Sequence, residues 1–319
     1  MHVLFVIDPL DSLNLETETS LLLMEEMARR GHVASVAELG DLYLTERSAG
    51  VRTRRIRIDL ARRPFYECAA AHDAGFGDFD LVLMRKDPPV DAAYVAATFV
   101  LERAALEVPV VNDPASLRNL NEKLLALSVP AFAPPSLLSA DADRLAAFAR
   151  AHGRVVLKPL EECSGRGIEF VDGAHAHAPI AAYLARRGGR PILAQRYLPG
   201  VAAGDKRIFL LDGEPIGAVN RVPAHPGRLA NIHQGARVEA TTLTDRERAI
   251  VAAVRPLLRA HRLWMAGVDV IDGHLTEVNV TSPSAARQIN AVSGTRLEVP
   301  IVDFLERVAG APRPVSQRP

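Results

Sequence analysis

The sequence predicts an α/β protein with an open, mainly parallel sheet near its amino terminus and an α+β remainder built on antiparallel sheets. Two observations lead to this fold class. Apolar runs of strand-forming residues alternate with helical patterns over residues 1 to about 118, which is typical of a parallel sheet with helical crossovers. Farther along, Asp212-Gly213 and Asp272-Gly273 are dipeptides that favour tight hairpins between antiparallel strands.

Hydrophobic periodicity locates the elements of the amino-terminal unit. The continuous apolar run Val3–Ile7 indicates a strand that is buried on both faces. A helix is expected over Thr19–Arg30, with Gly31 at its end. The other elements expected here are strands at Val33–Leu39, Leu81–Met84 and Val108–Asn112 and a helix at Ala92–Glu107.

Shorter elements are expected in the second half. They are helices at about 116–127 and 141–152 and strands at Val155–Lys158, Ile168–Val171, Ile192–Gln195 and Arg207–Leu211. The last residues, Ala309–Pro319, are rich in Pro and Arg. We expect this tail to fray, with disorder over residues 311–319.

Composition limits the class of protein. The 319 residues are 48% hydrophobic and 24% charged, as in soluble globular proteins. The 38 basic and 38 acidic residues cancel, so no overall field would draw the protein to nucleic acid or to an anionic membrane. No apolar run approaches the ~20 residues that span a bilayer, and the first residues indicate a strand rather than a signal peptide.

The two cysteines, Cys68 and Cys163, are far apart and belong to no paired motif. This pattern favours free thiols in a reducing compartment over a disulfide. We therefore expect a cytoplasmic protein without a membrane or nucleic-acid partner.

The densest run of charge is basic and lies between Arg52 and Arg63. Ile56, Ile58 and Leu60 alternate with its arginines. Such alternation indicates a half-buried strand with one wet face, whereas an arm that binds nucleic acid would carry aromatic residues among the charges.

A glycine-rich turn, Glu161–Gly167, lies between two predicted strands. Walker A loops and dinucleotide-binding loops instead run from a strand into a helix, whose amino terminus meets the phosphate. A loop between two strands can lay flexible backbone over phosphates, with Lys158 on the preceding strand as a fixed cation. The alternative is a plain hairpin turn. Taken by itself the motif favours this alternative, because a short glycine motif is weak evidence for a phosphate site.

A second informative segment is a predicted hairpin at 267–280. Glu277 and Asn279 are two residues apart on one strand and point to the same face. If Asp269 on the partner strand joins them, the three form a patch of oxygen ligands suited to magnesium that bridges phosphates. The alternative is a solvated polar face, although facing carboxylates without a cation are destabilising.

The length of the turn decides whether Asp269 joins this patch. A two-residue turn at Asp272-Gly273 would pair Asp269 with Thr276 and point it to the wrong face. A three-residue turn that includes His274 would pair Asp269 with Glu277. We predict the three-residue turn.

The segment Gly204–Phe209, together with Arg221, is the third candidate. Arg207 offers a planar guanidinium suited to phosphate or carboxylate oxygens. The alternative is a surface turn that leads into a strand.

Taken together, these segments resemble bacterial glutathione synthetase, a family of the ATP-grasp carboxylate–amine ligase superfamily. The matching segments occur in the family's order with similar separations, and they cover almost the whole chain. They are Asp8-Pro9, 38–44, 83–89, 111–118, 121–123, 157–160, 194–199, 204–207, 212–215 and 275–283.

The resemblance implies an ATP-grasp fold in which ATP is sandwiched between a lid and a carboxy-terminal domain. The implied units are a Rossmann-like amino-terminal (pre-ATP-grasp) domain at 1–118, a small α+β lid at 119–200 and an α+β catalytic unit at 201–310. It also implies a homo-oligomer, either a dimer or a tetramer.

The resemblance further implies the residues that bind nucleotide and metal. Lys123 and Lys158 would contact the ATP phosphates, and the hinge from Gln195 to Leu198 would meet adenine. The remaining positions implied for ATP are Ser164, Gly165, Gly167, Tyr197 and Asp205. Mg²⁺, or alternatively Mn²⁺, would be held by Asp269, Glu277 and Asn279.

Substrate and catalytic positions are implied in the same way. Arg207 would steady the transferred phosphoryl group, Asn279 and Ser282 would lie near the acceptor, and Arg85 would contact substrate. The stretch from Arg221 to Glu239 resembles the family's mobile loop. The catalytic and loop positions implied are Arg207, Arg221, Asn231, Gly235 and Arg237.

The implied reaction is ATP-dependent synthesis of glutathione from γ-glutamylcysteine and glycine through an acyl phosphate. Two loops depart from the family: Glu161–Gly165 replaces an Asp-Gly-Met-Gly-Gly type loop, and 231–235 is poorer in Ala and Gly. These departures keep open a related ligase for another acid and amine, as in natural-product assembly. A nucleotide-binding regulator without catalysis is a further alternative. A dehydrogenase is not supported, because the first strand is not followed by a Gly-rich dinucleotide-binding fingerprint.

Overall fold

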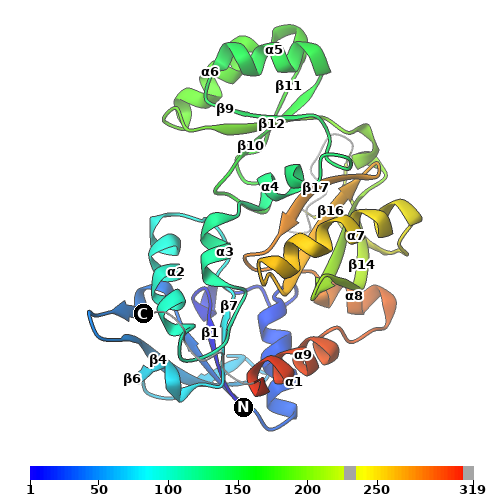
Figure 1. Cartoon of the computed structure of the whole chain (residues 1–319). Coiled ribbons are helices and arrows are strands. Elements are labelled where there is room, and N and C mark those ends of the chain that lie inside the picture. Colours follow the sequence, from blue (N-terminus) through cyan, green and yellow to red (C-terminus); the bar gives the residue numbers. More distant parts are fainter. Residues whose placement is uncertain (226–234, 312–319) are drawn as a thin grey trace.

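The computed structural model describes residues 1–225 and 235–311 of the chain. Within these residues the strands form three sheets, one from 2–111, one from 136–196 and one from 205–279. Figure 1 shows the second sheet and its helices at one end of the molecule, with the other two sheets below it.

A parallel core forms the centre of the amino-terminal sheet. Its strands are β1 (His2–Val6), β2 (Val33–Ala37), β7 (Leu81–Met84) and β8 (Val110–Val111), in the order β2-β1-β7-β8. Leu4 and Val6 pack with helix α2 (Ala92–Ala104), and Val3 and Phe5 pack with the helices on the other face. Both sets are buried because successive side chains point to opposite faces, which explains the continuous apolar run.

Antiparallel strands extend this sheet beyond β2. They are β3 (Leu42–Leu44), β4 (Ala49–Ile58), β5 (Tyr66–Cys68) and β6 (His72–Gly75). In β4, Val51 and Thr53 are buried while Arg52, Arg55 and Arg57 are exposed. The predicted half-buried strand is therefore confirmed, and the sheet contains more antiparallel pairing than the sequence suggested.

The predicted helix at 116–127 is wrong as a single element. The structure has α3 (Pro114–Asn119), α4 (Glu122–Leu125) and a 3₁₀ turn at Ala126–Ser128. Leu120 is extended, and the side chain of Asn121 accepts a hydrogen bond from the backbone N–H of Lys123. This capping bond starts a new helix, so the apolar periodicity continues across a break in the backbone.

The second sheet is four-stranded and antiparallel. Its strands are β9 (Ser136–Ser139), β10 (Val155–Pro159), β11 (Glu169–Val171) and β12 (Ile192–Arg196), in the order β11-β10-β12-β9. Helices α5 (Ala142–His152), as predicted, and α6 (His177–Arg186) pack on one face through a small apolar core. In Figure 1 they cover the outer face and leave the other face toward the rest of the molecule.

The third sheet is antiparallel and carries the hairpins expected from the Asp-Gly dipeptides. Its strands are β13 (Asp205–Leu211), β14 (Glu214–Val222), β15 (Arg237–Ala240), β16 (Met265–Ile271) and β17 (His274–Asn279), in the order β15-β14-β13-β16-β17. Helices α7 (Asp245–Ala260), α8 (Ala286–Ser293) and α9 (Glu298–Gly310) complete this half. Helix α9 returns to lie beside α1 (Thr19–Arg29) on the amino-terminal sheet (Figure 1).

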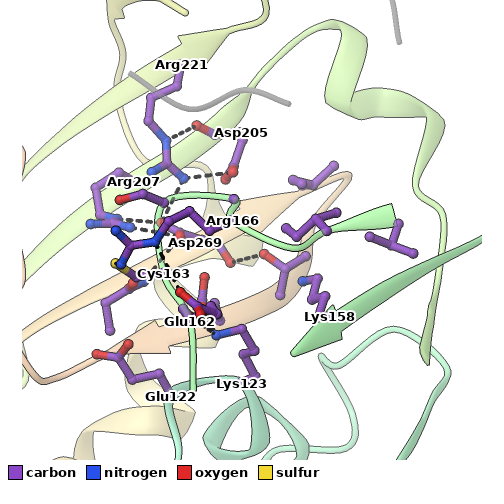
Figure 2. Close-up of a pocket in the computed structure, with 18 of the residues that line it drawn as sticks. Glu122, Lys123, Lys158, Glu162, Cys163, Arg166, Asp205, Arg207, Arg221 and Asp269 are labelled. Atoms are coloured by element: carbon purple, nitrogen blue, oxygen red, sulfur yellow. Dashed lines mark hydrogen bonds and ion pairs between the residues drawn. The ribbon is translucent and has the colours of Figure 1, made fainter. Parts of the chain in front are cut away.

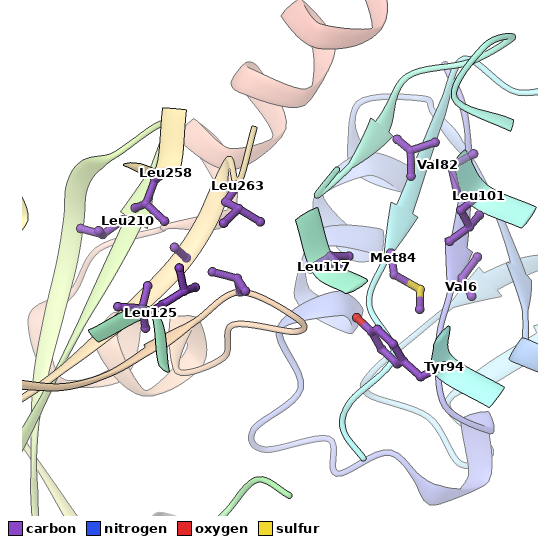
Figure 3. Close-up of a cluster of buried hydrophobic side chains, with 14 of the residues drawn as sticks. Val6, Val82, Met84, Tyr94, Leu101, Leu117, Leu125, Leu210, Leu258 and Leu263 are labelled. Carbon is purple, nitrogen blue, oxygen red and sulfur yellow. The ribbon is translucent and has the colours of Figure 1, made fainter. Parts of the chain in front are cut away.

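The amino-terminal sheet and the third sheet share one hydrophobic core. Figure 3 shows Met84 and Tyr94 on one side of this cluster, Leu210 and Leu258 on the other, and Leu117 between them. Because the two sheets share one tightly packed apolar cluster, the carboxyl-terminal ends of β7 and β17 are held at a defined separation.

Polar side chains lock this junction. Buried Asn112 donates to the carbonyls of Met265 and Val280 at 2.7 Å each and accepts from the N–H of Met265 at 2.9 Å. Glu122 accepts from the N–H groups of Val280 and Thr281 at 2.7 and 2.8 Å. The backbone that leaves β17 is thus tied to both preceding units.

We predict that Asn112→Ala lowers the free energy of unfolding by about 2–4 kcal/mol, because it leaves a buried N–H and two buried carbonyls without partners. Asn112→Asp is the matched comparison: it keeps the acceptor for Met265 but sets a buried carboxylate oxygen against the carbonyls of Met265 and Val280, so it should destabilise the fold at least as much. Urea unfolding of both variants measures the effect. An unchanged midpoint for the alanine variant would show that Asn112 does not lock the junction.

Candidate active site

A cavity opens between the four-stranded sheet, the β16–β17 hairpin and the loops after β7 and β17. Figure 2 shows charged side chains from these elements converging on it. The structure brings the following predicted site residues into its wall: Lys123, Lys158, Ser164, Gly165, Gln195, Tyr197, Leu198, Asp205, Arg207, Arg221, Asp269, Glu277, Asn279 and Ser282.

Other predicted residues lie elsewhere. Gly167 is the last residue of the glycine-rich turn, with a φ of 68°, and does not line the cavity; Arg85 is buried and does not line it either. Gly235 and Arg237 are exposed, with Arg237 paired to Glu239 at 2.5 Å. Asn231 falls outside the described residues.

The β16–β17 hairpin corrects the predicted turn and confirms the predicted pairing. Ile271 pairs with His274 across a two-residue turn whose Asp272 and Gly273 have φ values of 51° and 66°, as a type I′ turn requires. The predicted three-residue turn is therefore wrong. The register then shifts between Asp269 and Val270, so that Asp269 nevertheless lies opposite Glu277.

The shift is a β-bulge in β17. Val270 pairs with Leu275 and Asp269 with Glu277, which leaves Thr276 as the extra residue. The hydroxyl of Thr276 donates to the carbonyl of Asp269 at 3.1 Å. The bulge turns Asp269 to the face of Glu277 and Asn279, an outcome that turn length by itself did not predict.

Asp269 is the centre of a buried charge cluster. Arg207 approaches it with Nε at 2.5 Å and Nη2 at 2.9 Å, and Arg221 Nη2 lies 2.9 Å away. Asn279 Nδ2 donates to the same carboxylate at 3.2 Å. Burial acts to raise the pKa of Asp269, but the two guanidinium groups outweigh it and hold this pKa below its usual range.

Asp205 extends the cluster from β13. It pairs with Arg221 at 2.7 Å, and its Oδ1 has no partner among the residues that the structure describes. Burial raises the pKa of Asp205 to about 6, although Arg221 partly offsets this effect. Two carboxylates therefore share Arg221 in a site with little water.

Two lysines face the cluster from the opposite side. Lys123 Nζ donates to the carbonyl of Glu162 at 2.5 Å and lies 3.4 Å from Glu277. Lys158 Nζ donates to Gln195 Oε1 at 2.8 Å, and burial lowers the pKa of Lys158. The predicted pair of cations is thus assembled from α4 and β10, far apart in the sequence.

The glycine-rich loop crosses over the cavity. Ser164 and Gly165 have φ values of 57° and 76°, which give the loop its reversal between β10 and β11. Arg166 Nη2 donates to the carbonyl of Pro88 at 3.0 Å and contacts Cys163 Sγ at 3.4 Å. The loop is therefore anchored to the amino-terminal unit by a residue that the sequence analysis did not single out.

One part of the wall is apolar. Val156, Phe170, Tyr197 and Leu198 line it, and the rings of Phe170 and Tyr197 meet edge to face at 5.8 Å. The guanidinium of Arg154 lies 4.9 and 4.7 Å from their centroids, which fixes both rings. A flat, apolar slot beside a row of cations suits a molecule with a planar ring and an anionic tail.

Sequence reasoning missed Thr17, Glu122, Asp87 and Gln288, which also line the cavity. Asp87 stood inside a matched segment but had no stated role. Burial, followed by the nearby charge of Glu18, raises the pKa of Asp87 to about 6. No local pattern distinguishes Gln288 on α8, because its place in the wall depends on how α8 packs.

Comparison with known families identifies the family of the chain. The family model for the N-terminal domain of prokaryotic glutathione synthetase matches residues 1–118, and that for its ATP-grasp domain matches residues 122–294. The chain belongs to the prokaryotic glutathione synthetase family. Members of the family match along nearly the whole chain, so the membership covers every element that builds the cavity.

Individual relatives agree. The chain is 38% identical over 318 residues to the glutathione synthetase of Synechocystis sp., covering 96% of this chain and 99% of the relative. It is 42% identical over 313 residues to the glutathione synthetase of Gloeobacter violaceus, covering 96% of each. It is also 38% identical over 305 residues to that of Pseudomonas syringae pv. tomato, covering 95% of this chain and 96% of the relative.

Solved structures confirm the fold class. The D-cycloserine synthetase DcsG aligns with a TM-score of 0.67 at 16% identity, covering 96% of this chain and 99% of that one. A RimK domain ATP-grasp protein from Sphaerobacter thermophilus aligns with a TM-score of 0.64 at 20% identity, covering 95% and 99%. The chain therefore has the predicted ATP-grasp fold.

Among the helices within residues 1–225 and 235–311, none is both long enough and apolar enough to cross a membrane. The same part of the chain holds no group of three or more His, Cys, Asp or Glu side chains placed for a metal ion. The predicted metal site is of a different composition, with two carboxylates and one amide.

We predict that Arg221→Gln lowers the free energy of unfolding by about 3–5 kcal/mol, because Asp205 and Asp269 keep buried charge without this partner. Adding Asp205→Asn to this variant should recover part of the loss, since it removes one of the charges that Arg221 compensates. Urea unfolding of the wild type, both single variants and the double variant forms the test. Strictly additive effects would contradict the proposed coupling.

Proposed function

We propose that this chain is an ATP- and magnesium-dependent ligase that joins γ-glutamylcysteine to glycine, forming glutathione, ADP and phosphate. The observation that carries this proposal is a cavity lined by four cations together with two carboxylates and an amide that could hold a metal. The cations are Lys123, Lys158, Arg207 and Arg221, and the metal-binding candidates are Asp269, Glu277 and Asn279. Family membership supports it, since curated glutathione synthetases are 37–42% identical over most of the chain.

ATP is proposed to bind between the four-stranded sheet and the β16–β17 hairpin. Its adenine would fill the apolar slot beside Tyr197 and Leu198, next to the hinge that follows β12. Lys123 and Lys158 would contact the phosphates as fixed point charges. The backbone of Ser164 and Gly165 would lie over the phosphates in the manner of an anion-binding loop.

The metal-binding proposal is supported by the donor types. Glu277, Asn279 and Asp269 offer hard oxygen ligands of the kind that Mg²⁺ or Mn²⁺ takes. The carboxylate oxygens of Asp269 already contact Arg207, Arg221 and Asn279, so a cation would share or replace one of these contacts. Bound Mg²⁺ would neutralise charge on the phosphate oxygens.

The chain's own residues would then handle the charge that moves during the reaction. A substrate carboxylate attacks the γ-phosphate in line, which forms an acyl phosphate and ADP. Arg207 and Arg221 hold guanidinium groups where negative charge develops on oxygen. Ser282 and Asn279 lie on the same wall and are proposed to orient the acyl group for attack by the amine of glycine.

The unit boundaries, assembly and compartment are part of the same proposal. We take residues 1–118 as the amino-terminal domain, 119–200 as the lid and 201–310 as the catalytic unit. Gly235, Arg237, Gly167 and Arg85 are proposed to join the site or support it when substrates bind. The proposed form is a cytoplasmic homo-oligomer, a dimer or a tetramer, that acts on small molecules.

We predict phosphate release from Mg²⁺-ATP only when γ-glutamylcysteine and glycine are both present, because the acyl phosphate forms on the first and is consumed by the second. The measurement is phosphate release with each component omitted in turn, together with mass detection of glutathione. ATP binding without release would overturn the proposed substrates and favour the alternative ligase for another acid and amine.

We predict that Glu277→Gln lowers turnover at least ~100-fold, because it removes a carboxylate that is proposed to hold the Mg²⁺ bound to the phosphates. The melting temperature should stay nearly unchanged, since Glu277 is partly exposed and its one described ion pair is the 3.4 Å contact with Lys123. Exposed Glu46 gives the matched control, Glu46→Gln. An unfolded Glu277 variant would show a structural role instead, and chelation of the metal should reproduce the loss in the wild type.

A further inference from the structure

Three residues of the cavity wall, Thr17, Asp87 and Gln288, have no part in the proposed roles. Asp87 accepts a hydrogen bond from Ser282, and Gln288 donates to the carbonyl of Glu16, the residue before Thr17. The three residues come from the loop before α1, the loop after β7 and the first turns of α8. Three segments that are remote in sequence therefore place a hydroxyl, a carboxylate and an amide on one stretch of wall.

Gln288 has an amide oxygen without a partner. Its side chain is only 8% exposed, and Nε2 donates to the carbonyl of Glu16 at 3.2 Å. This bond orients the amide, while Oε1 has no hydrogen-bond partner among the residues that the structure describes. A buried amide oxygen left unpaired is destabilising, so its presence in a cavity wall indicates that a ligand supplies the donor.

Asp87 carries a second unused acceptor. Its side chain is exposed toward the cavity and accepts a hydrogen bond from Ser282. Within the described part of the chain, no Lys or Arg forms an ion pair with this carboxylate at 4 Å or less. Burial, followed by the charge of Glu18, raises the pKa of Asp87, and the hydrogen bond from Ser282 and the charge of Arg85 offset only part of this effect.

The neighbouring cations have other partners, although Nη1 of buried Arg85 has none among the described residues. Lys86 Nζ lies 2.8 Å from Asp8 and donates to the carbonyl of Asp87 at 2.5 Å. Arg85 donates to Ser20 Oγ and to the carbonyl of Pro283, both at 3.0 Å. Neither side chain lines the cavity, so the carboxylate of Asp87 remains available to a ligand.

We propose that Asp87 and Gln288, with the hydroxyl of Thr17, bind the free α-ammonium group of the acid substrate and thereby select a γ-glutamyl compound. An ammonium group has three N–H donors, and this wall offers three oxygen acceptors of which one is charged. The inference rests on the proposed function, because it identifies the end of γ-glutamylcysteine that lies away from the reaction.

The polarity of the whole cavity fits this orientation. Arg207, Arg221 and the two lysines line the part of the cavity where phosphate is proposed to lie. Asp87, Gln288 and Thr17 are acceptors on another part of its wall. In γ-glutamylcysteine the reacting cysteinyl carboxylate and the glutamyl ammonium are separate groups of opposite charge, so one orientation satisfies both.

The test compares γ-glutamylcysteine with glutaryl-cysteine, which lacks only the α-amino group. For the wild type we expect kcat/KM to be about 10- to 100-fold higher with the amine, the range of a charged hydrogen bond. Asp87→Asn should bring the two values to within a few-fold by lowering only the first. Exposed Asp73, on β6, gives the matched control Asp73→Asn, for which the ratio should not change.

Two variants of Gln288 separate recognition from packing. Gln288→Glu keeps an acceptor, although it loses the bond to the carbonyl of Glu16, and should preserve the preference for the amine, whereas Gln288→Leu should reduce it. If Gln288→Leu instead lowers the melting temperature and impairs both substrates alike, the role of Gln288 is structural and the inference is overturned.

Binding measurements keep this inference distinct from the proposed function. No turnover of γ-glutamylcysteine and glycine by the wild type would overturn the proposed function. Equal calorimetric affinity of wild type and Asp87→Asn for γ-glutamylcysteine would overturn the ammonium site, whatever the turnover. Equal use of both acids by the wild type would overturn it as well.

Discussion

The bulge in the β16–β17 hairpin is the constraint on which the candidate site depends. A regular hairpin closed by Asp272-Gly273 would place Asp269 opposite Thr276 and turn it away from Glu277. The extra residue in β17 reverses this outcome and brings the two carboxylates opposite each other. The regular pairing of β13 with β16 sets Arg207 directly opposite Asp269 from the other neighbouring strand.

A second pair of carboxylates, Asp205 and Asp269, is buried together, and arginine side chains compensate its charge. Both carboxylates are largely shielded from water. Arg221 forms ion pairs with both of them, and Arg207 on the strand beside Asp269 donates to Asp269. Such clusters seldom stabilise a fold more than apolar packing would. Their value lies in holding charged groups ready at a point where a reaction moves negative charge.

The surroundings of this cluster show how remote segments build one cavity. Asn112 and Glu122 pin the end of β17 to the preceding units, and the shared apolar core holds the amino-terminal and third sheets together. The four-stranded sheet supplies Lys158 and the glycine-rich loop, which Arg166 fastens to Pro88. The cavity wall thus combines cations, an apolar stretch and hydrogen-bond acceptors that come from segments remote in the chain.

The sequence by itself determined the fold class, most strands and the Asp-Gly hairpins, because periodicity and turn chemistry are local. It also singled out most of the charged residues that line the cavity. It also predicted that Asp269 meets Glu277, although through the wrong turn. Tertiary structure decided the rest. The break at Leu120-Asn121, the bulge at Thr276, the anchoring by Arg166 and the placement of Gln288 depend on packing between segments far apart in the chain, and no local pattern of residues encodes such contacts.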